Sequence, residues 1–197
     1  VNAENEPFVI GEDETRRTEN TKHFLMSDGT RKAVIYGNAV HYADANGKLR
    51  EINNILSYDK DKKEYTNTQN SFKATFKEST GKGDMFTLEN GGYSISWEYN
   101  AGLLRRALSR VEYEERKLSS DKISQIAEKS EDSITYKNIE SDCELQYVVT
   151  NNGVKENIIL NSPVNKNEFS FTVTAEGLNL LKNADGSISA KNAQGEE

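Results

Sequence analysis

Apolar and polar residues alternate with a period of two along much of this 197-residue chain. Each alternating stretch places its apolar side chains on one face of a strand and Ser, Thr, Lys or Glu on the other. This pattern is typical of half-buried antiparallel strands. The apolar members of the four clearest stretches are Phe72, Ala74 and Phe76; Tyr93, Ile95, Trp97 and Tyr99; Leu145, Tyr147 and Val149; and Phe169, Phe171 and Val173.

Five dipeptides between these stretches supply the positive φ angles that short hairpin turns need. They are Asp28-Gly29, Asn46-Gly47, Asn90-Gly91, Asn152-Gly153 and Asp185-Gly186. Because one hairpin follows another, the order indicates a meander or sandwich and not βαβ units. We therefore predict an all-β fold, an antiparallel β-sandwich or meander built from successive hairpins.

Residues 101–131 depart from this pattern and form a polar insertion. A near-helical stripe and a strand-like alternation overlap between residues 103 and 118, so helix and strand both stay open there. Residues 120–129 predict a short helix with Ser120 as its N-cap and Ile123, Ile126 and Ala127 on one face. We therefore expect one or two short helices in this insertion.

The domain organisation follows from the same distribution. Residues 1–22 hold six acidic residues and few apolar ones, which predicts a ragged N-terminal segment with one short strand at residues 8–10. Residues 23–197 are expected to form one β-rich domain that carries the insertion at 101–131.

Composition narrows the classes of function. Hydrophobic residues make up 35% of the chain, which one-faced strands explain, and no apolar run is long enough to span a bilayer. The chain has 25 basic and 32 acidic residues, a net charge of -7, with the lysines dispersed. Such a chain lacks the basic surface that concentrates a polyanion, so we expect neither nucleic acid nor a membrane as partner.

Reactive side chains are few. Cys143 is the single cysteine, and the flanking Asp142 and Glu144 disfavour a reactive thiolate, so we expect a buried apolar role. The two histidines, His23 and His41, belong to no nucleophile elbow, His-Glu-x-x-His helix or ligand pair at i+2 or i+4. We interpret both as surface or satisfied core residues.

Acidic residues near turns invite a calcium hypothesis, but the segments at residues 44–47 and 59–61 lack the twelve-residue loop with its closing Glu. The sequence therefore predicts no catalytic residue, no cofactor and no metal ligand.

A glycoside hydrolase stays a third hypothesis, because its two carboxylates can come from anywhere in a fold. It requires them about 5 to 10 Å apart across a deep cleft.

The candidate binding residues are Tyr93, Trp97 and Tyr99, which share one face of a predicted strand. Exposed flat rings in a row could hold a glycan, which gives a carbohydrate-binding module as the second hypothesis. The competing interpretation is that they are core residues, because Ile95 shares their face and a chain with few apolar residues needs its largest ones inside. We favour burial over the glycan platform, and the exposure of Trp97 discriminates between the two.

Several blocks resemble the region near the start of very large exported, cell-wall-associated proteins of Gram-positive bacteria. Those proteins carry DNRLRE-type modules and RHS or YD repeats further along, none of which occurs in these 197 residues. The resemblance covers most of the chain except residues 1–15 and 101–131. Its blocks are residues 17–20, 24–30, 40–42, 46–48, 70–73, 93–97, 134–139, 144–149 and 154–160.

This resemblance implies a secreted module, displayed at or attached to the cell wall, that is not an enzyme and carries no catalytic residue. It implies other domains of the same polypeptide as partners, together with cell-wall or host glycans. It also implies that a further strand-rich segment can follow, so the domain is expected to be truncated at its C-terminal end. The first hypothesis is accordingly a structural or adhesive module at the N-terminus of a larger envelope protein.

Overall fold

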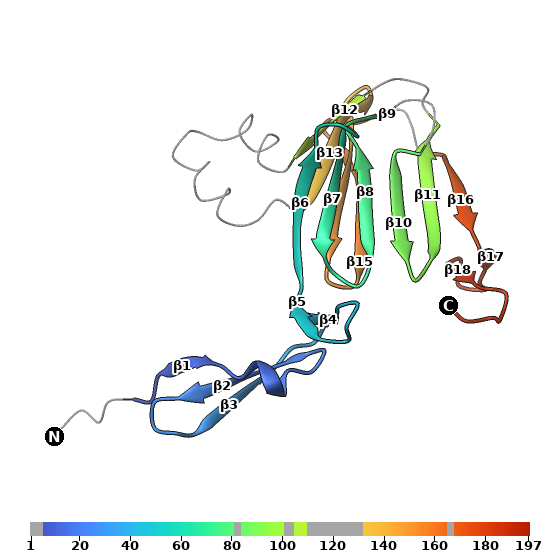
Figure 1. Cartoon of the computed structure of the whole chain (residues 1–197). Helices are drawn as coiled ribbons and strands as arrows, with labels where there is room; N and C mark the ends of the chain where they lie inside the picture. The colour runs from blue at the N-terminus through green and yellow to red at the C-terminus, as the bar shows by residue number, and fades with distance from the viewer. Residues whose placement is uncertain (1–5, 81–83, 101–104, 110–131, 165–167) are drawn as a thin grey trace. The chain divides into compact units, whose positions relative to one another are not determined.

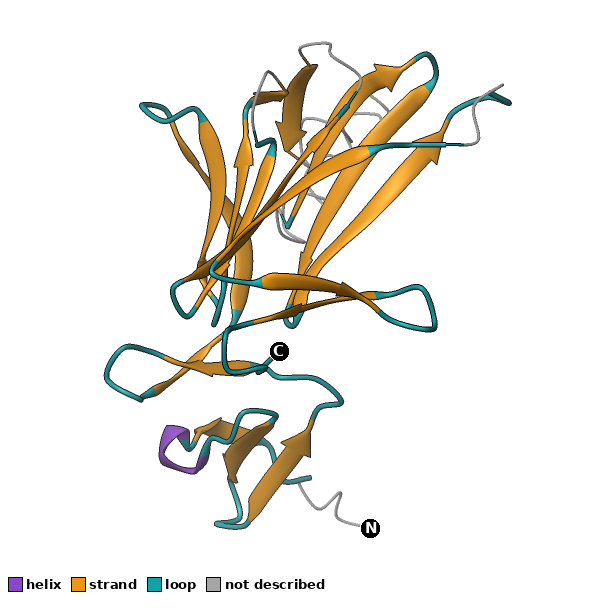
Figure 2. Cartoon of the chain, turned by 90° about the vertical axis from the view of Figure 1, so that its right-hand side faces the viewer, coloured by secondary structure: helices purple, strands orange, loops and turns teal. Residues whose placement is uncertain are grey.

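The computed structural model describes residues 6–80, 84–100, 105–109, 132–164 and 168–197. Over these residues the chain forms strands joined by turns and one short 3-10 helix, η1 (Glu14–Arg16), without an α-helix (Figure 1, Figure 2). Each strand pair whose register the structure gives is antiparallel. The prediction of an all-β antiparallel fold is therefore confirmed.

Eighteen strands are described, with lengths from two to eight residues. In chain order they are β1 (Val9–Glu12), β2 (Thr21–Met26), β3 (Arg31–Ile35), β4 (His41–Ala43), β5 (Leu49–Glu51), β6 (Asn53–Asp59), β7 (Glu64–Gln69), β8 (Lys73–Lys77), β9 (Ser79–Thr80), β10 (Phe86–Asn90), β11 (Tyr93–Tyr99), β12 (Arg105–Ser109), β13 (Ser133–Glu140), β14 (Cys143–Thr150), β15 (Gly153–Leu160), β16 (Phe171–Glu176), β17 (Asn179–Lys182) and β18 (Ile188–Lys191).

The chain divides into two compact units. The N-terminal unit comprises residues 1–53 and 69–71, and the large unit comprises residues 54–68 and 72–197. In the N-terminal unit β1, β2 and β3 form one sheet and β4 pairs with β5. The short strand predicted in the leading segment is present as β1. It pairs with β2 across the predicted boundary between residues 22 and 23, which falls inside β2.

The large unit contains two larger sheets and a terminal hairpin. The six-stranded sheet has the order β16-β11-β10-β8-β7-β6, and the five-stranded sheet has the order β15-β14-β13-β12-β9. Figure 1 shows β10, β11 and β16 side by side, followed by the separate hairpin of β17 and β18. All five predicted turn dipeptides connect successive antiparallel strands, so the hairpin prediction is confirmed.

One turn geometry recurs in both units. In the turn at residues 44–48, the Asp44 backbone N–H donates to the Lys48 carbonyl (2.9 Å) and the Gly47 N–H donates to the Asp44 carbonyl (2.8 Å). Residues 26–30, 183–187 and 192–196 repeat both hydrogen bonds. The fourth residue is a glycine with φ between +73° and +90° in each, the left-handed region that other residues rarely adopt.

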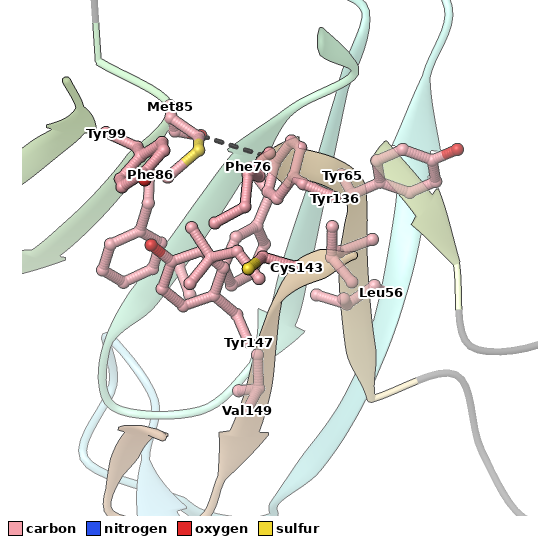
Figure 3. Close-up of a cluster of buried hydrophobic side chains, with 14 of the residues drawn as sticks. Leu56, Tyr65, Phe76, Met85, Phe86, Tyr99, Tyr136, Cys143, Tyr147 and Val149 are labelled. Carbon is pink, nitrogen blue, oxygen red and sulfur yellow. Dashed lines mark hydrogen bonds between the residues drawn. The ribbon is translucent and has the colours of Figure 1, made fainter. Parts of the chain in front are cut away.

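The core of the large unit is built from aromatic residues in register. One row runs across four strands of the six-stranded sheet through Tyr65, Phe76, Phe86 and Trp97, and Val173, which follows Trp97 in register on β16, is 44% exposed at the edge of the sheet. The rings of Phe76 and Phe86 lie 5.6 and 5.2 Å from the ring of Tyr147 on the five-stranded sheet, so side chains of both sheets meet in one core (Figure 3). Leu145, Tyr147 and Val149 are all buried, as their alternation predicts.

The central insertion corrects one expectation. Residues 105–109 form β12, which pairs with β13 on one side and β9 on the other. The helical alternative is therefore wrong for these five residues, because their backbone groups are used in strand pairing. The short helix predicted at residues 120–129 lies outside the described residues. No helix in the described part of the chain has the length and apolar character needed to cross a membrane.

Candidate functional site

The predicted glycan platform lies on β11, and the structure gives its three aromatic residues different environments. Tyr99 is only 8% exposed, and its ring packs 5.3 Å from the ring of Phe171. Its hydroxyl donates a hydrogen bond to Glu140 Oε1 (2.9 Å). Tyr99 is thus a core residue, with its one polar atom satisfied by a neighbouring strand.

Trp97 is half-buried, and its indole N–H forms hydrogen bonds within the protein. Its ring lies 4.3 Å from that of Phe86, and its Nε1 donates to the Tyr147 hydroxyl (2.8 Å) and to Glu156 Oε2 (3.2 Å). Burial, assisted by the negative charge of Glu156, raises the pKa of the Tyr147 phenol. The phenol therefore stays protonated and holds the Trp97 ring against the second sheet.

Tyr93 is the exposed member of the three, with 36% of its surface accessible. A Cβ atom added to Gly177 would lie 2.9 Å from Tyr93 Cδ1, so the ring packs directly on this glycine. The Tyr93 hydroxyl accepts a hydrogen bond from Asn192 Nδ2 (3.4 Å). The ring borders an open hollow of about 320 Å³ whose lining comprises Asn90, Gly91, Tyr93, Leu178, Ala190, Asn192, Glu196 and Glu197.

The three aromatic residues therefore do not form one exposed platform. Trp97 and Tyr99 pack into the core, while Tyr93 alone borders a hollow with amide and carboxylate groups. An aromatic ring beside such groups can stack on a sugar ring and hydrogen-bond its hydroxyls. Glycan binding by Tyr93 remains a prediction, whereas Trp97 and Tyr99 contribute to packing.

The N-terminal unit contains a buried polar centre that the sequence patterns did not indicate. His41 is 1% exposed, and its Nδ1 lies 2.7 Å from the Thr18 carbonyl oxygen. This contact places the proton on Nδ1 and leaves Nε2 facing Glu12 Oε1 at 3.7 Å. Arg17 donates to both Glu12 oxygens (2.7 and 3.0 Å) and lowers the pKa of that carboxyl group.

This centre is built from three separate segments, since Glu12 ends β1, Arg17 follows η1 and His41 begins β4. An imidazole nitrogen beside a carboxylate is a typical start of a metal site. Among the residues that the structure describes, however, no group of three or more His, Cys, Asp or Glu side chains is placed to hold a metal ion. The arrangement ties the three segments together.

The remaining candidates occupy structural positions. Cys143 is 1% exposed within β14, which confirms the buried role expected from its acidic neighbours. Asp44 Oδ1 accepts the backbone N–H groups of Asn46 and Lys48 (2.9 and 3.0 Å), so this carboxylate stabilises a turn. Asp59 does the same for Asp61 and Lys62. His23 is half-buried in β2.

Comparison with known proteins gives one informative likeness. A wall-associated protein of Geobacillus stearothermophilus is 28% identical to this chain over 189 residues, which cover 95% of the chain and 70% of that protein. No family model matches the chain, and no solved structure matches it. The chain is thus similar, over nearly its whole length, to a protein described as associated with the cell wall.

Proposed function

We propose that this chain is a non-enzymatic, extracellular structural or adhesive module of a larger bacterial cell-envelope protein. The observation that carries the proposal is the 28% identity to the wall-associated protein over 95% of the chain. A likeness of that extent includes most of both units. The proposal therefore concerns the chain as a whole and not one motif within it.

The architecture of the large unit supports a module that interacts through the outward faces of its sheets. We infer that the two large sheets form a β-sandwich, because Phe76, Phe86 and Trp97 of one sheet pack on Tyr147 of the other. The largest side chains are thereby used to join the sheets. The outward faces then remain as the surfaces through which the module interacts.

The acidic residues around a second hollow, on the side of β6 and β7, argue against hydrolysis there. Asp59 and Glu64 both line this hollow. A glycosidase acid needs a raised pKa, yet the backbone N–H of Lys62 lowers the pKa of Asp59. Glu64 Oε2 accepts a hydrogen bond from Lys77 Nζ (2.8 Å), so it too is engaged in structure.

The finer assignment rests on the blocks that resemble the start of RHS or YD-repeat and DNRLRE-containing proteins. On this proposal the chain belongs to such a protein, Gram-positive in origin, and its partners are other domains of that polypeptide and cell-wall or host glycans. Nucleic acid and membranes are not expected partners on this proposal, because the lysines are dispersed and the net charge is -7. The full-length gene tests this directly, with a signal peptide upstream and repeats downstream as the expected result.

The cellular location is tested by fractionation of the organism that encodes the chain. Antibodies raised against the recombinant chain are expected to detect it in the fraction that muramidase releases from the wall, together with a wall marker. A cytoplasmic enzyme serves as the lysis control. Recovery only with the cytoplasmic marker would contradict the proposal.

Carbohydrate binding by exposed aromatics is the second candidate function, and the placement of Tyr93 beside the polar hollow favours it. A glycan array probed with the wild type and with Tyr93→Ala tests this function. Tyr36→Ala is the matched control, because Tyr36 is 37% exposed and belongs to the N-terminal unit. Binding that survives Tyr93→Ala, or no binding by the wild type, rejects this hollow as the site.

A further inference from the structure

The outward face of the six-stranded sheet carries a continuous row of hydroxyl side chains. The row occupies the face opposite the core row that contains Phe76 and Phe86, because its members are the chain neighbours of those residues. The strand register places one hydroxyl residue on each of five neighbouring strands. The members are Thr66 on β7, Thr75 on β8, Thr87 on β10, Ser96 on β11 and Thr174 on β16.

The accessible members of this hydroxyl row alternate across the strands. Thr75 and Ser96 are recessed, with 8% and 6% of their surface exposed. Thr66 and Thr87 are half-buried and Thr174 is exposed. Since neighbouring strands lie about 4.8 Å apart, the accessible hydroxyls recur at intervals of about 10 Å. This interval is close to the length of one disaccharide unit in an extended wall glycan.

Both lysines beside the row are paired with glutamates within the protein, and the further acidic residues of this face, Glu98 and Glu176, repel a polyanion. Lys73 Nζ lies 2.9 Å from Glu89 Oε2, and Lys77 Nζ lies 2.8 Å from Glu64 Oε2. Both pairs join residues of the same outward face, on strands that contribute to the row. Internally paired charges give little attraction for a polyanion, so the chemistry favours a neutral ligand.

The hydrogen-bond donors and acceptors of the hydroxyl row indicate the class of ligand. Each threonine hydroxyl presents one donor and two acceptor positions, which suits the hydroxyl and acetamido groups of a sugar chain. Thr66 and Thr75 share a hydrogen bond of 3.0 Å between their hydroxyls, which orients Thr66 and leaves its other positions available. The row also lacks the aromatic and apolar centre that characterises protein–protein interfaces.

We propose that this face binds a neutral, extended glycan of the cell wall, which lies across the strands and hydrogen-bonds Thr66, Thr87 and Thr174. This inference rests on the proposed function of the chain as a wall module. It assigns the wall contact to the outward face of the six-stranded sheet and not to the aromatic residues of β11. The contact is made by repeated weak hydrogen bonds, so affinity depends on a ligand that spans several sugars.

Co-sedimentation with peptidoglycan sacculi tests the proposal, after the anionic wall polymers have been removed from the sacculi. The wild type is expected to pellet with them, and the triple variant Thr66→Val, Thr87→Val, Thr174→Val is expected to bind at least tenfold more weakly. Valine retains the β-branched shape that strands favour, so the variant should fold. Unchanged Trp97 emission and thermal unfolding verify that the fold is intact.

Three matched controls define the site. Ser96→Ala removes a recessed hydroxyl of the row, Thr150→Val removes an exposed hydroxyl of β14 on the five-stranded sheet, and Tyr93→Ala removes the exposed aromatic ring. All three are expected to bind as the wild type does. Binding should also persist as the salt concentration rises, because the ligand is neutral, whereas loss of binding in salt would indicate an anionic polymer and overturn the proposal.

Failure of this inference is distinguishable from failure of the proposed function. If the folded triple variant pellets as the wild type does, or if the wild type does not pellet, the assignment of the hydroxyl row is overturned. The wall location is judged separately by fractionation, since a module carried by a larger wall protein can reside there without binding glycan. Recovery of the chain in the wall fraction would then leave the proposed function in place.

Discussion

The two units are stabilised in different ways. The large unit has a hydrophobic core drawn from both of its sheets, whereas the N-terminal unit has no buried hydrophobic residue among its described residues. The two residues buried there, Thr21 and His41, are polar. Backbone pairing, the Glu12–Arg17 interaction and surface ion pairs such as Lys22–Glu51 hold its strands together.

Hairpins of the same design can therefore be stabilised by a hydrophobic core in one unit and by polar interactions in the other. The same turn geometry occurs in both units, so turns alone do not decide how a unit is stabilised. Small sheets without an apolar core are marginal, because strand hydrogen bonds contribute little net free energy. We therefore expect the N-terminal unit to unfold first on heating or in denaturant.

The chain contains separate probes for each unit. Its single tryptophan, Trp97, lies in the large unit, and both histidines, His23 and His41, lie in the N-terminal unit. Indole fluorescence therefore follows the large unit, while the imidazole NMR signals follow the N-terminal unit.

The largest effect is expected from Phe86→Ala. Phe86 is fully buried between Phe76, Trp97 and Tyr147, and its removal leaves a cavity that should lower the free energy of unfolding of the large unit by about 3 to 5 kcal/mol. Denaturant unfolding followed by Trp97 fluorescence measures it. Phe8→Ala is the control, because Phe8 is 66% exposed in the N-terminal unit and should change stability by no more than about 0.5 kcal/mol.

Arg17→Met is expected to weaken the N-terminal unit next. The substitution retains the aliphatic stem but removes both hydrogen bonds to Glu12, at an expected cost of about 1 to 3 kcal/mol. The imidazole signals should show earlier unfolding while Trp97 fluorescence is unchanged. Arg16→Met is the control, since the Arg16 side chain is 54% exposed and its ion pair with Asp13 is long. Equal effects of both variants would contradict this role of Arg17.

Tyr147→Phe tests the polar contact inside the large core. The phenol accepts the indole N–H of Trp97, and its removal should cost about 1 kcal/mol, because Glu156 remains as a second acceptor. The Trp97 emission maximum should shift as the environment of Nε1 changes. A variant with unchanged stability and emission would show that Glu156 alone satisfies the indole.

The smallest effects concern pH and have opposite directions in the two units. Arg17 lowers the pKa of Glu12 in the folded state. The ionised Glu12 therefore stabilises the N-terminal unit above its ordinary pKa of about 4.5, and this stabilisation is lost as the pH falls through the pKa of the folded state. Burial raises the pKa of Tyr136 and Tyr147. The two protonated phenols therefore stabilise the large unit below their ordinary pKa of about 10, and this stabilisation is lost at higher pH. Acid should weaken the N-terminal unit and alkali the large unit, as NMR and tyrosinate absorbance can measure.

The strands and turns of the fold could be predicted from the sequence, because alternation and Asx-Gly pairs are local signals. The burial of Tyr99 followed from the same reasoning, since Ile95 shares its face. The N-terminal polar centre could not be predicted, because Glu12, Arg17 and His41 come from three segments with no fixed spacing. Even the sequence-based boundary at residue 22 passes through a paired strand.

The hydroxyl row depends on information that no local pattern contains. Short turns join β7 to β8 and β10 to β11, but Thr174 is placed beside Ser96 only because β16 pairs with β11 over a long sequence separation. A shift of one residue in any of these pairings would move the hydroxyl to the other face. The row is a property of the register and not of any single strand.

The recurring five-residue turn also bears on how such a chain evolves. It needs a glycine at its fourth position and two backbone hydrogen bonds, and in each of the four examples an Asp or Asn side chain at the first or third position accepts the backbone N–H of the fifth residue. Two positions per loop therefore carry the turn geometry, while the second position, which is Ser or Ala in the four examples, takes part in none of these hydrogen bonds. A lineage built from these turns can diverge far in sequence while each hairpin keeps its register.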